Sequence, residues 1–194
     1  MQLALFDFDG TITTKDSIMD FVRFAVGPFK FLIGVVLLSP LLVGYALRLV
    51  SNTFIKEFGF KLFFRNWDFS RFSKITSDYS RLRLPKLIRE KALKQITWHK
   101  SQGHHVVVVT ASFEEILADW CRNQQIDLIS NTLDIQDGYI TGKIKNENCY
   151  GPGKAEKIVK ILDLKQYSHI YAYGDSDGDR AMFALADESF YRIF

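Results

Sequence analysis

Residues 3–14, LALFDFDGTITT, constrain the fold of this chain more than any other stretch. Four apolar residues, enough for a strand, end at Asp7 and Asp9, and Gly10 follows. Side chains two positions apart in a strand share a face, so both carboxylates start out directed to one place at the C-terminal end of a buried strand. Open α/β sheets bind their ligands at that end. The stretch therefore predicts a ligand site built on two carboxylates.

Two like charges at a strand end are costly unless a cation lies between them, so the pair indicates a metal ion. Carboxylate oxygens are hard ligands, which favour Mg²⁺ over zinc. The alternative interpretation is an ordinary exit from a strand, in which Asp and Gly serve only the turn. The rest of the chain decides between the two.

The composition indicates a globular protein. With 194 residues, of which 47% are hydrophobic and 24% charged, the chain suits one core domain with an insertion. The net charge of +3 is unevenly distributed, because eleven Lys/Arg accompany only five Asp/Glu between Lys15 and Arg83. No nucleic-acid-binding motif accompanies this basic excess, so we expect no nucleic-acid partner. The first residues already form a strand and carry no basic leader, which predicts a cytoplasmic protein.

Residues 15–84 form a separate helical piece, whose oddest part is the segment 31–47. This segment, FLIGVVLLSPLLVGYAL, holds seventeen residues without a charge, the lower limit for a membrane-spanning helix, and Pro40 lies near its middle. A single crossing would put Asp7 and the later motifs on opposite sides of a membrane. The segment must then return as two short helices bent near Ser39, or lie in the membrane interface as one helix. A buried helical hairpin is the other interpretation.

Residues 85–194 alternate between helix and strand. Helices are expected over 86–100, 113–124, 154–162 and 179–186, and strands over 106–109, 128–129, 170–173 and 190–193, with a hairpin that turns at Asp137 and Gly138. This alternation predicts an α/β fold: a doubly wound, Rossmann-like, mostly parallel sheet with a helical cap inserted after the first strand. The expected core is 1–14 and 85–194, and the expected cap is 15–84.

Polar residues follow three of the expected strands directly. They are Asp7, Asp9, Thr110, Ser112, Asp175 and Asp179. The C-terminal ends of parallel strands lie at one edge of a sheet, so these groups should converge. Lys154 begins a helix, where its ammonium group and the helix N-terminus both attract an anion. Carboxylates, a hydroxyl and a lysine around a divalent cation are what phosphoryl transfer requires.

Four segments of the chain resemble the four motifs of the haloacid dehalogenase superfamily of phosphatases. They are DFDGT at 7–11, VVVVTAS at 106–112, Lys154 within GPGKAEKI, and GDSDGD at 174–179. Within the superfamily the chain is most similar to the branch that contains phosphoserine phosphatase. The resemblance covers both ends of the chain, with the motifs in the family's order.

The resemblance implies a role for each motif residue in a Mg²⁺-dependent phosphatase. Asp7 would be the nucleophile that forms an aspartyl phosphate, and Asp9 would be the general acid and base. Thr110 would bind the phosphoryl oxygens, and Lys154 would balance their charge. The implied metal site consists of Asp7, the Asp9 backbone carbonyl and Asp175, with Asp179 in support.

Two further residues are candidates for substrate binding. Ser112 contacts phosphate or caps the helix that begins at Phe113. Asp16 lies near the position where phosphoserine phosphatase uses a glutamate to bind the amino group of its substrate. Asp16 is one methylene shorter, and no partner arginine for a substrate carboxylate accompanies it.

The apolar cap resembles that of the bacterial phosphatidylglycerophosphatase of the same branch. This likeness implies a lipid phosphate as substrate, reached at the cytoplasmic face of the inner membrane by a basic cap drawn to anionic lipid. The alternative is a small soluble phosphomonoester such as phosphoserine. An alternative from another class is a membrane-attached interaction protein that has lost catalysis. The carboxylates at 7, 9 and 175 argue against it, because a lapsed site does not need acids that repel one another.

Overall fold

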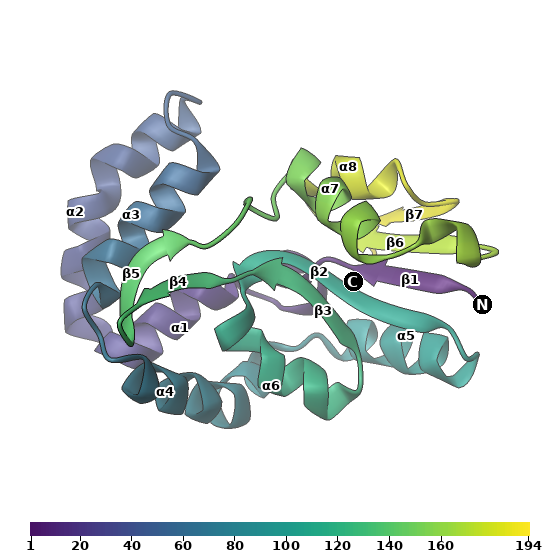
Figure 1. The fold of residues 1–194 in the computed structure, drawn as a ribbon, viewed down its shortest axis with the longest axis horizontal. Coiled ribbons are helices and arrows are strands. Elements are labelled where there is room, and N and C mark those ends of the chain that lie inside the picture. The colour runs from purple at the N-terminus through teal and green to yellow at the C-terminus, as the bar shows by residue number, and fades with distance from the viewer.

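A computed structural model describes all residues, 1–194, and its centre is a five-stranded parallel sheet in the order β3-β2-β1-β6-β7 (Figure 1). The strands are β1 (Leu3–Phe6), β2 (His105–Phe113), β3 (Asp127–Asn131), β6 (Ile170–Gly174) and β7 (Glu188–Tyr191). The central strand β1 pairs in parallel with both β2 and β6. The ends of these three strands therefore meet at one edge.

Helices cover both faces of this sheet, which confirms the doubly wound fold (Figure 1). On one face lie α5 (Glu90–Ser101) and α6 (Glu114–Gln124), and on the other lie α7 (Pro152–Ile161) and α8 (Arg180–Phe183). Side chains alternate between the two faces along β1, with Ala4 and Phe6 in one hydrophobic core and Leu3 and Leu5 in the other. Both faces of β1 are buried, as the unbroken apolar run predicts.

Four helices lie between β1 and α5, the helix that leads back to the sheet. They are α1 (Ser17–Val26), α2 (Pro28–Ala46), α3 (Asn52–Phe64) and α4 (Phe69–Leu82). The antiparallel hairpin of β4 (Leu133–Gln136) and β5 (Tyr139–Ile144), predicted around Asp137 and Gly138, packs against α3. One anchor of this contact is the backbone N–H of Ile144, which donates to Glu57 Oε1 at 2.9 Å.

The segment predicted as a bent pair of helices or a buried hairpin is a single helix, α2, and those two interpretations are wrong. Pro40 has no N–H to bond the Val36 carbonyl, but the Ser39 hydroxyl donates to that carbonyl at 2.7 Å, so the helix continues. Only Gly34 and Leu38 of its 19 residues are buried. By length and composition alone, α2 is the one helix in the structure that is apolar enough to cross a membrane.

The segment that leaves the sheet after β1 and the segment that returns before α5 are hydrogen-bonded to each other. The N–H of Thr14 donates to the Leu87 carbonyl, and the N–H of Arg89 donates to the Ile12 carbonyl, each at 2.8 Å. A 3₁₀ turn occupies Leu84–Leu87, so α5 begins at Glu90, four residues later than predicted. The predicted last helix is also shorter, because a 3₁₀ turn at Asp177–Asp179 takes up its start and it ends at Phe183.

Candidate active site

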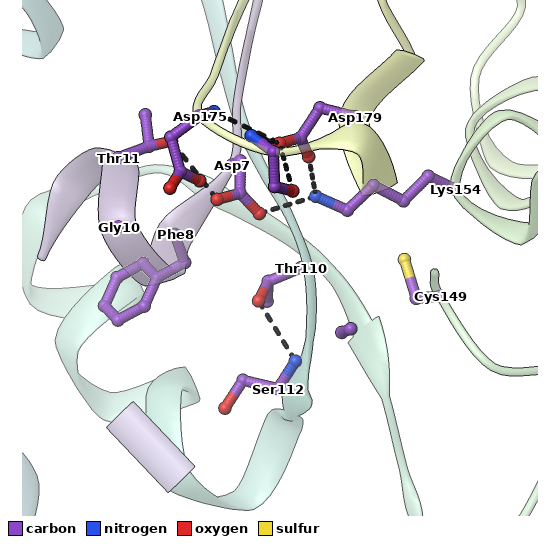
Figure 2. A network of polar contacts seen from close by, with 12 residues as sticks. Asp7, Phe8, Gly10, Thr11, Thr110, Ser112, Cys149, Lys154, Asp175 and Asp179 are labelled. Atoms are coloured by element: carbon purple, nitrogen blue, oxygen red, sulfur yellow. Dashed lines mark hydrogen bonds and ion pairs between the residues drawn. The ribbon is translucent and has the colours of Figure 1, made fainter. Parts of the chain in front are cut away.

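Three carboxylates meet where β1 and β6 end. Asp7 follows β1, and Asp175 and Asp179 follow β6, so parallel pairing of these strands brings them to one edge. One oxygen from each lies within 4.8 Å of the others (Figure 2). Asp7 and Asp179 are buried, and Asp175 is half-buried. Burial and the charge of Asp179 raise the pKa of Asp175.

Lys154 bridges two of these carboxylates. Its Nζ lies 2.5 Å from Asp7 Oδ1 and 2.5 Å from Asp179 Oδ1, and the whole side chain is buried (Figure 2). Burial alone would lower the pKa of Lys154, but Asp7 and Asp179 outweigh burial and raise it. A buried ammonium of this kind is charged only because both partners are carboxylates.

Asp7 and Asp9 titrate in different ranges although they are two residues apart. Burial raises the pKa of Asp7 to about 6, and Lys154 opposes that shift. Burial raises the pKa of Asp9 to about 8; the charge of Asp16 adds to this shift, and a 2.6 Å hydrogen bond from the Ser17 N–H to Asp9 Oδ1 opposes it. Lys154 thus favours the ionised form of Asp7, whereas burial and the charge of Asp16 favour the protonated form of Asp9. Acid and base roles are commonly divided in this way between neighbouring carboxyl groups.

The acidic cluster suits a hard divalent cation such as Mg²⁺. Both oxygens of Asp179 are already engaged, Oδ1 by Lys154 and Oδ2 by the Asp175 N–H and by the N–H and hydroxyl of Ser176. The second oxygen of Asp7 accepts only a 3.2 Å bond from Thr11. Asp7 and Asp175 therefore fit as direct ligands, and Asp179 fits as their support.

A glycine makes room for the Asp175 carboxylate. Gly10 has a φ of +85°, and a Cβ at this position would lie 2.4 Å from Asp175 Oδ2. Any side chain there would push against the acidic cluster and strain the backbone. The glycine of the first motif thus serves the site as well as the turn.

Seven of the eight residues predicted from sequence line one cavity of about 230 Å³ at this edge of the sheet. They are Asp7, Asp9, Asp16, Thr110, Lys154, Asp175 and Asp179. Asp16 also begins α1, where its Oδ1 accepts the Met19 N–H at 2.8 Å. The carboxylate of Asp9 lies outside the cluster of three, so only its backbone carbonyl stays a predicted metal ligand.

Ser112 is the eighth predicted residue and does not line the cavity. Its hydroxyl lies 3.1 Å from that of Ser17, and its N–H donates to Thr110 Oγ1 at 3.0 Å. β2 runs on to Phe113, which is the N-cap of α6, so Ser112 is not that cap either. Its contacts instead orient the Thr110 hydroxyl and join β2 to α1.

Sequence reasoning missed Lys56, which reaches the cavity from α3. Its Nζ donates to the Ala111 carbonyl at 2.6 Å, and burial lowers its pKa to about 8, although Asp16 and Asp9 oppose the shift. Lys56 is one of eleven cations between Lys15 and Arg83, so nothing in the sequence distinguished it. Asn52 and Tyr150 also line the cavity and carry no motif.

Comparisons with known proteins identify the family of this chain. The family model described as haloacid dehalogenase-like hydrolase matches residues 4–184. Protein CicA of Caulobacter vibrioides is 31% identical over 196 aligned positions, which cover 99% of this chain and 86% of that protein.

Two solved structures share the fold. A protein of unknown function from Bordetella pertussis Tohama I superposes with a TM-score of 0.83 at 22% identity, covering 97% of this chain and 88% of that one. A phosphoserine phosphatase solved as a phospho-aspartyl intermediate analogue superposes with a TM-score of 0.70 at 21% identity, covering 97% and 84%. The family resemblance of the four motifs is confirmed: this chain belongs to the haloacid dehalogenase-like hydrolases.

Proposed function

We propose that this protein is a Mg²⁺-dependent phosphomonoester hydrolase that works through an aspartyl phosphate on Asp7. The observation that carries the proposal is the Asp7–Lys154–Asp179 arrangement, with Asp9, whose pKa is raised by burial, at the same cavity. An ionised carboxylate is a competent nucleophile toward phosphorus, and a protonated one can release an alcohol.

In the first step an oxygen of Asp7 attacks the phosphorus of the ester. The new bond joins Asp7 to phosphorus, the bond from phosphorus to the ester oxygen breaks, and Asp9 gives its proton to that oxygen. Lys154 and the Thr110 hydroxyl offset the charge on the phosphoryl oxygens. Asp16 and Lys56 line the same cavity, and we place the leaving alcohol beside them.

In the second step the ionised Asp9 takes a proton from water. The water oxygen attacks phosphorus, the bond to Asp7 breaks, and inorganic phosphate leaves with Asp7 restored. The proton taken by Asp9 restores the acid for the next cycle. Each residue thus returns to its starting protonation state.

Mg²⁺, bound by Asp7, Asp175 and the Asp9 carbonyl, would neutralise charge on the phosphoryl group. Asp179 would hold Lys154 and the 175–176 backbone in place for it. A chelator should therefore abolish hydrolysis reversibly, and hydrolysis unaffected by a chelator would contradict the metal role.

We further propose that residues 1–14 and 85–194 act as the catalytic core and 15–84 as a substrate-selecting cap. The exposed apolar helix α2 supports a lipid phosphate as substrate, bound at the cytoplasmic face of the inner membrane. Large side chains on α2 with more than half of their surface exposed are Phe29, Leu32, Val36, Leu37 and Val43. Lys30 and Arg48, which flank the uncharged segment of α2, would attract anionic lipid headgroups.

A phosphate-release screen tests both levels of the proposal. Lysolipid and phospholipid phosphates in mixed micelles should be hydrolysed faster than phosphoserine and other soluble phosphomonoesters. The reverse order would assign the enzyme to soluble substrates, for which the charged pair of Asp16 and Lys56 beside the cavity would suit a zwitterion. No release from any phosphomonoester, with Mg²⁺ present, would contradict the phosphatase itself.

A further inference from the structure

The first turn of α3 is tied to the sheet layer by side chains from a loop that the catalytic scheme does not use. Asn148 lies between β5 and α7. Its Nδ2 donates to Asn52 Oδ1 at 3.0 Å and to Thr53 Oγ1 at 3.1 Å. Asn52 and Thr53 are the first two residues of α3, so the tie acts where that helix begins.

Asn148 is itself held by a buried amide on the sheet. Asn131, at the end of β3, is fully buried, and its Nδ2 donates to Asn148 Oδ1 and to the Ala111 carbonyl, each at 2.8 Å. The Asn131 Oδ1 accepts the N–H of Cys149 at 2.7 Å. The Nδ2 and the Oδ1 of the Asn131 amide are therefore both hydrogen-bonded inside the protein, as a buried polar group requires.

The same carbonyl receives Lys56. The Lys56 Nζ donates to Ala111 O at 2.6 Å, and Lys56 is one helical turn beyond Asn52 on α3. Ala111 is also adjacent to Thr110, and both residues line the cavity. Two side-chain routes, one through Lys56 and one through Asn148 and Asn131, therefore join the start of α3 to a single carbonyl beside the phosphoryl site.

We propose that Asn148 is a positioning residue, which fixes the start of α3 so that Lys56 stays over the leaving-group side of the cavity. Its expected effect on catalysis rests on the proposed phosphatase function, whereas its expected effect on the order of α3 does not. A further polar contact of the first turn goes to α2, where Asn52 Nδ2 donates to the Tyr45 hydroxyl at 3.2 Å. The polar contacts that join the α3 region to the β4–β5 hairpin lie at Glu57 and at Asn66, whose N–H donates to the Ile140 carbonyl. Neither of them holds the first turn.

The kinetic test is a double-mutant cycle with Asn148→Ala and Lys56→Ala. With p-nitrophenyl phosphate and Mg²⁺, each single change should lower kcat/KM about 10-fold, a loss typical of a disturbed positioning group. Because Asn148 acts through Lys56, adding Asn148→Ala to the Lys56→Ala enzyme should cost no more than about 2-fold. A fully additive loss of about 100-fold would overturn the proposal, since a residue with an independent structural role behaves that way. Asn146→Ala, an exposed amide on the same loop, is the matched control.

Hydrogen exchange tests the structural half without any turnover. Amide exchange over residues 52–60 should rise at least about 10-fold in Asn148→Ala, while β2 and β6 stay protected and Asn146→Ala matches the parent. Unchanged exchange over 52–60 would overturn the proposal. If the parent enzyme hydrolyses no phosphomonoester, the proposed function fails, and the exchange result still decides whether Asn148 holds α3.

Discussion

The candidate active site and helix α2 differ in how their side chains are shielded from water. At the site, buried carboxylates and a buried ammonium satisfy one another at 2.5 Å. Along α2, apolar side chains stay exposed and nothing within the chain covers them. The charged groups of the site are satisfied within the chain, whereas much of the apolar surface of α2 is left open to solvent.

The largest expected effect is on the nucleophile. Asp7→Asn keeps the shape of the side chain but removes the charge that attacks phosphorus, so kcat should fall about 10³-fold or more. The measurement is phosphate release with a soluble phosphomonoester and Mg²⁺. Asp177→Asn, at an exposed carboxylate paired with Arg180, should leave the rate unchanged. An Asp7→Asn enzyme that keeps its rate would remove Asp7 from the chemistry.

The next effect concerns stability at the site. Lys154→Met removes the ammonium that two buried carboxylates share, and at pH 8 in a chelator the free energy of unfolding should fall by about 3 to 5 kcal/mol. Urea denaturation measures this change. The exposed Lys160→Met should change the free energy by less than about 0.5 kcal/mol. A Lys154→Met protein as stable as the parent would mean that the Lys154 ammonium does not stabilise the buried carboxylates of Asp7 and Asp179.

The contribution of His99 to stability should be lost in acid; His99 is buried on the sheet face opposite α7. Its Nε2 lies 2.9 Å from the Tyr173 hydroxyl and its Nδ1 lies 2.8 Å from His104 Nδ1. Burial, with help from His104, lowers the pKa of His99 to about 4, so the unfolded chain binds a proton at higher pH than the folded one. Stability from this group is complete above about pH 6.5 and is lost as the pH falls toward 4, by up to about 3 kcal/mol.

Urea denaturation between pH 7 and pH 4 tests this prediction. His99→Gln, which cannot titrate, should be less stable at pH 7 but should lose less stability over that range. The same pH dependence in parent and variant would assign the acid sensitivity to other groups.

The smallest effect on stability, and the most specific one, is expected on α2. Val36 and Val43 are seven residues apart, share a face and are both about 60% exposed. Changing both to Glu should alter the free energy of unfolding by less than about 1 kcal/mol and leave soluble-substrate turnover unchanged, but should abolish flotation with anionic vesicles. The control, Ser73→Glu with Ser77→Glu, adds the same charge to exposed positions on α4. Equal flotation of both variants would contradict a membrane role for α2.

The same two regions differ in how far the sequence alone could predict them. The site was predictable because strand ends in a parallel sheet meet at one edge, so motif residues separated by more than 160 positions converge. Helix α2 was not, because an apolar run has the same pattern whether it is buried or exposed. Pro40 lies within it, and the Ser39 hydroxyl donates to the Val36 carbonyl that Pro40 cannot bond.

Lys56 and the Asn148 network were also beyond prediction from the sequence. A lysine and three asparagines are ordinary surface residues in a sequence, and only the contacts of α3 with the end of β2 and with the loop after β5 make them a network. The different pKa values of Asp7 and Asp9 arise in the same way, from burial that the motif does not encode. Motif spacing identifies the reacting groups, whereas tertiary packing sets their protonation states.

The most direct test of the central claim is mass spectrometry of an acid-quenched reaction of Asp9→Asn enzyme with p-nitrophenyl phosphate and Mg²⁺. The activated leaving group needs no acid, whereas the second step lacks its base, so the phosphoenzyme should accumulate. We expect one phosphoryl group, on the Asp7 side chain. A phosphoryl group on another residue, or continued turnover with no phosphoenzyme, would contradict this expectation.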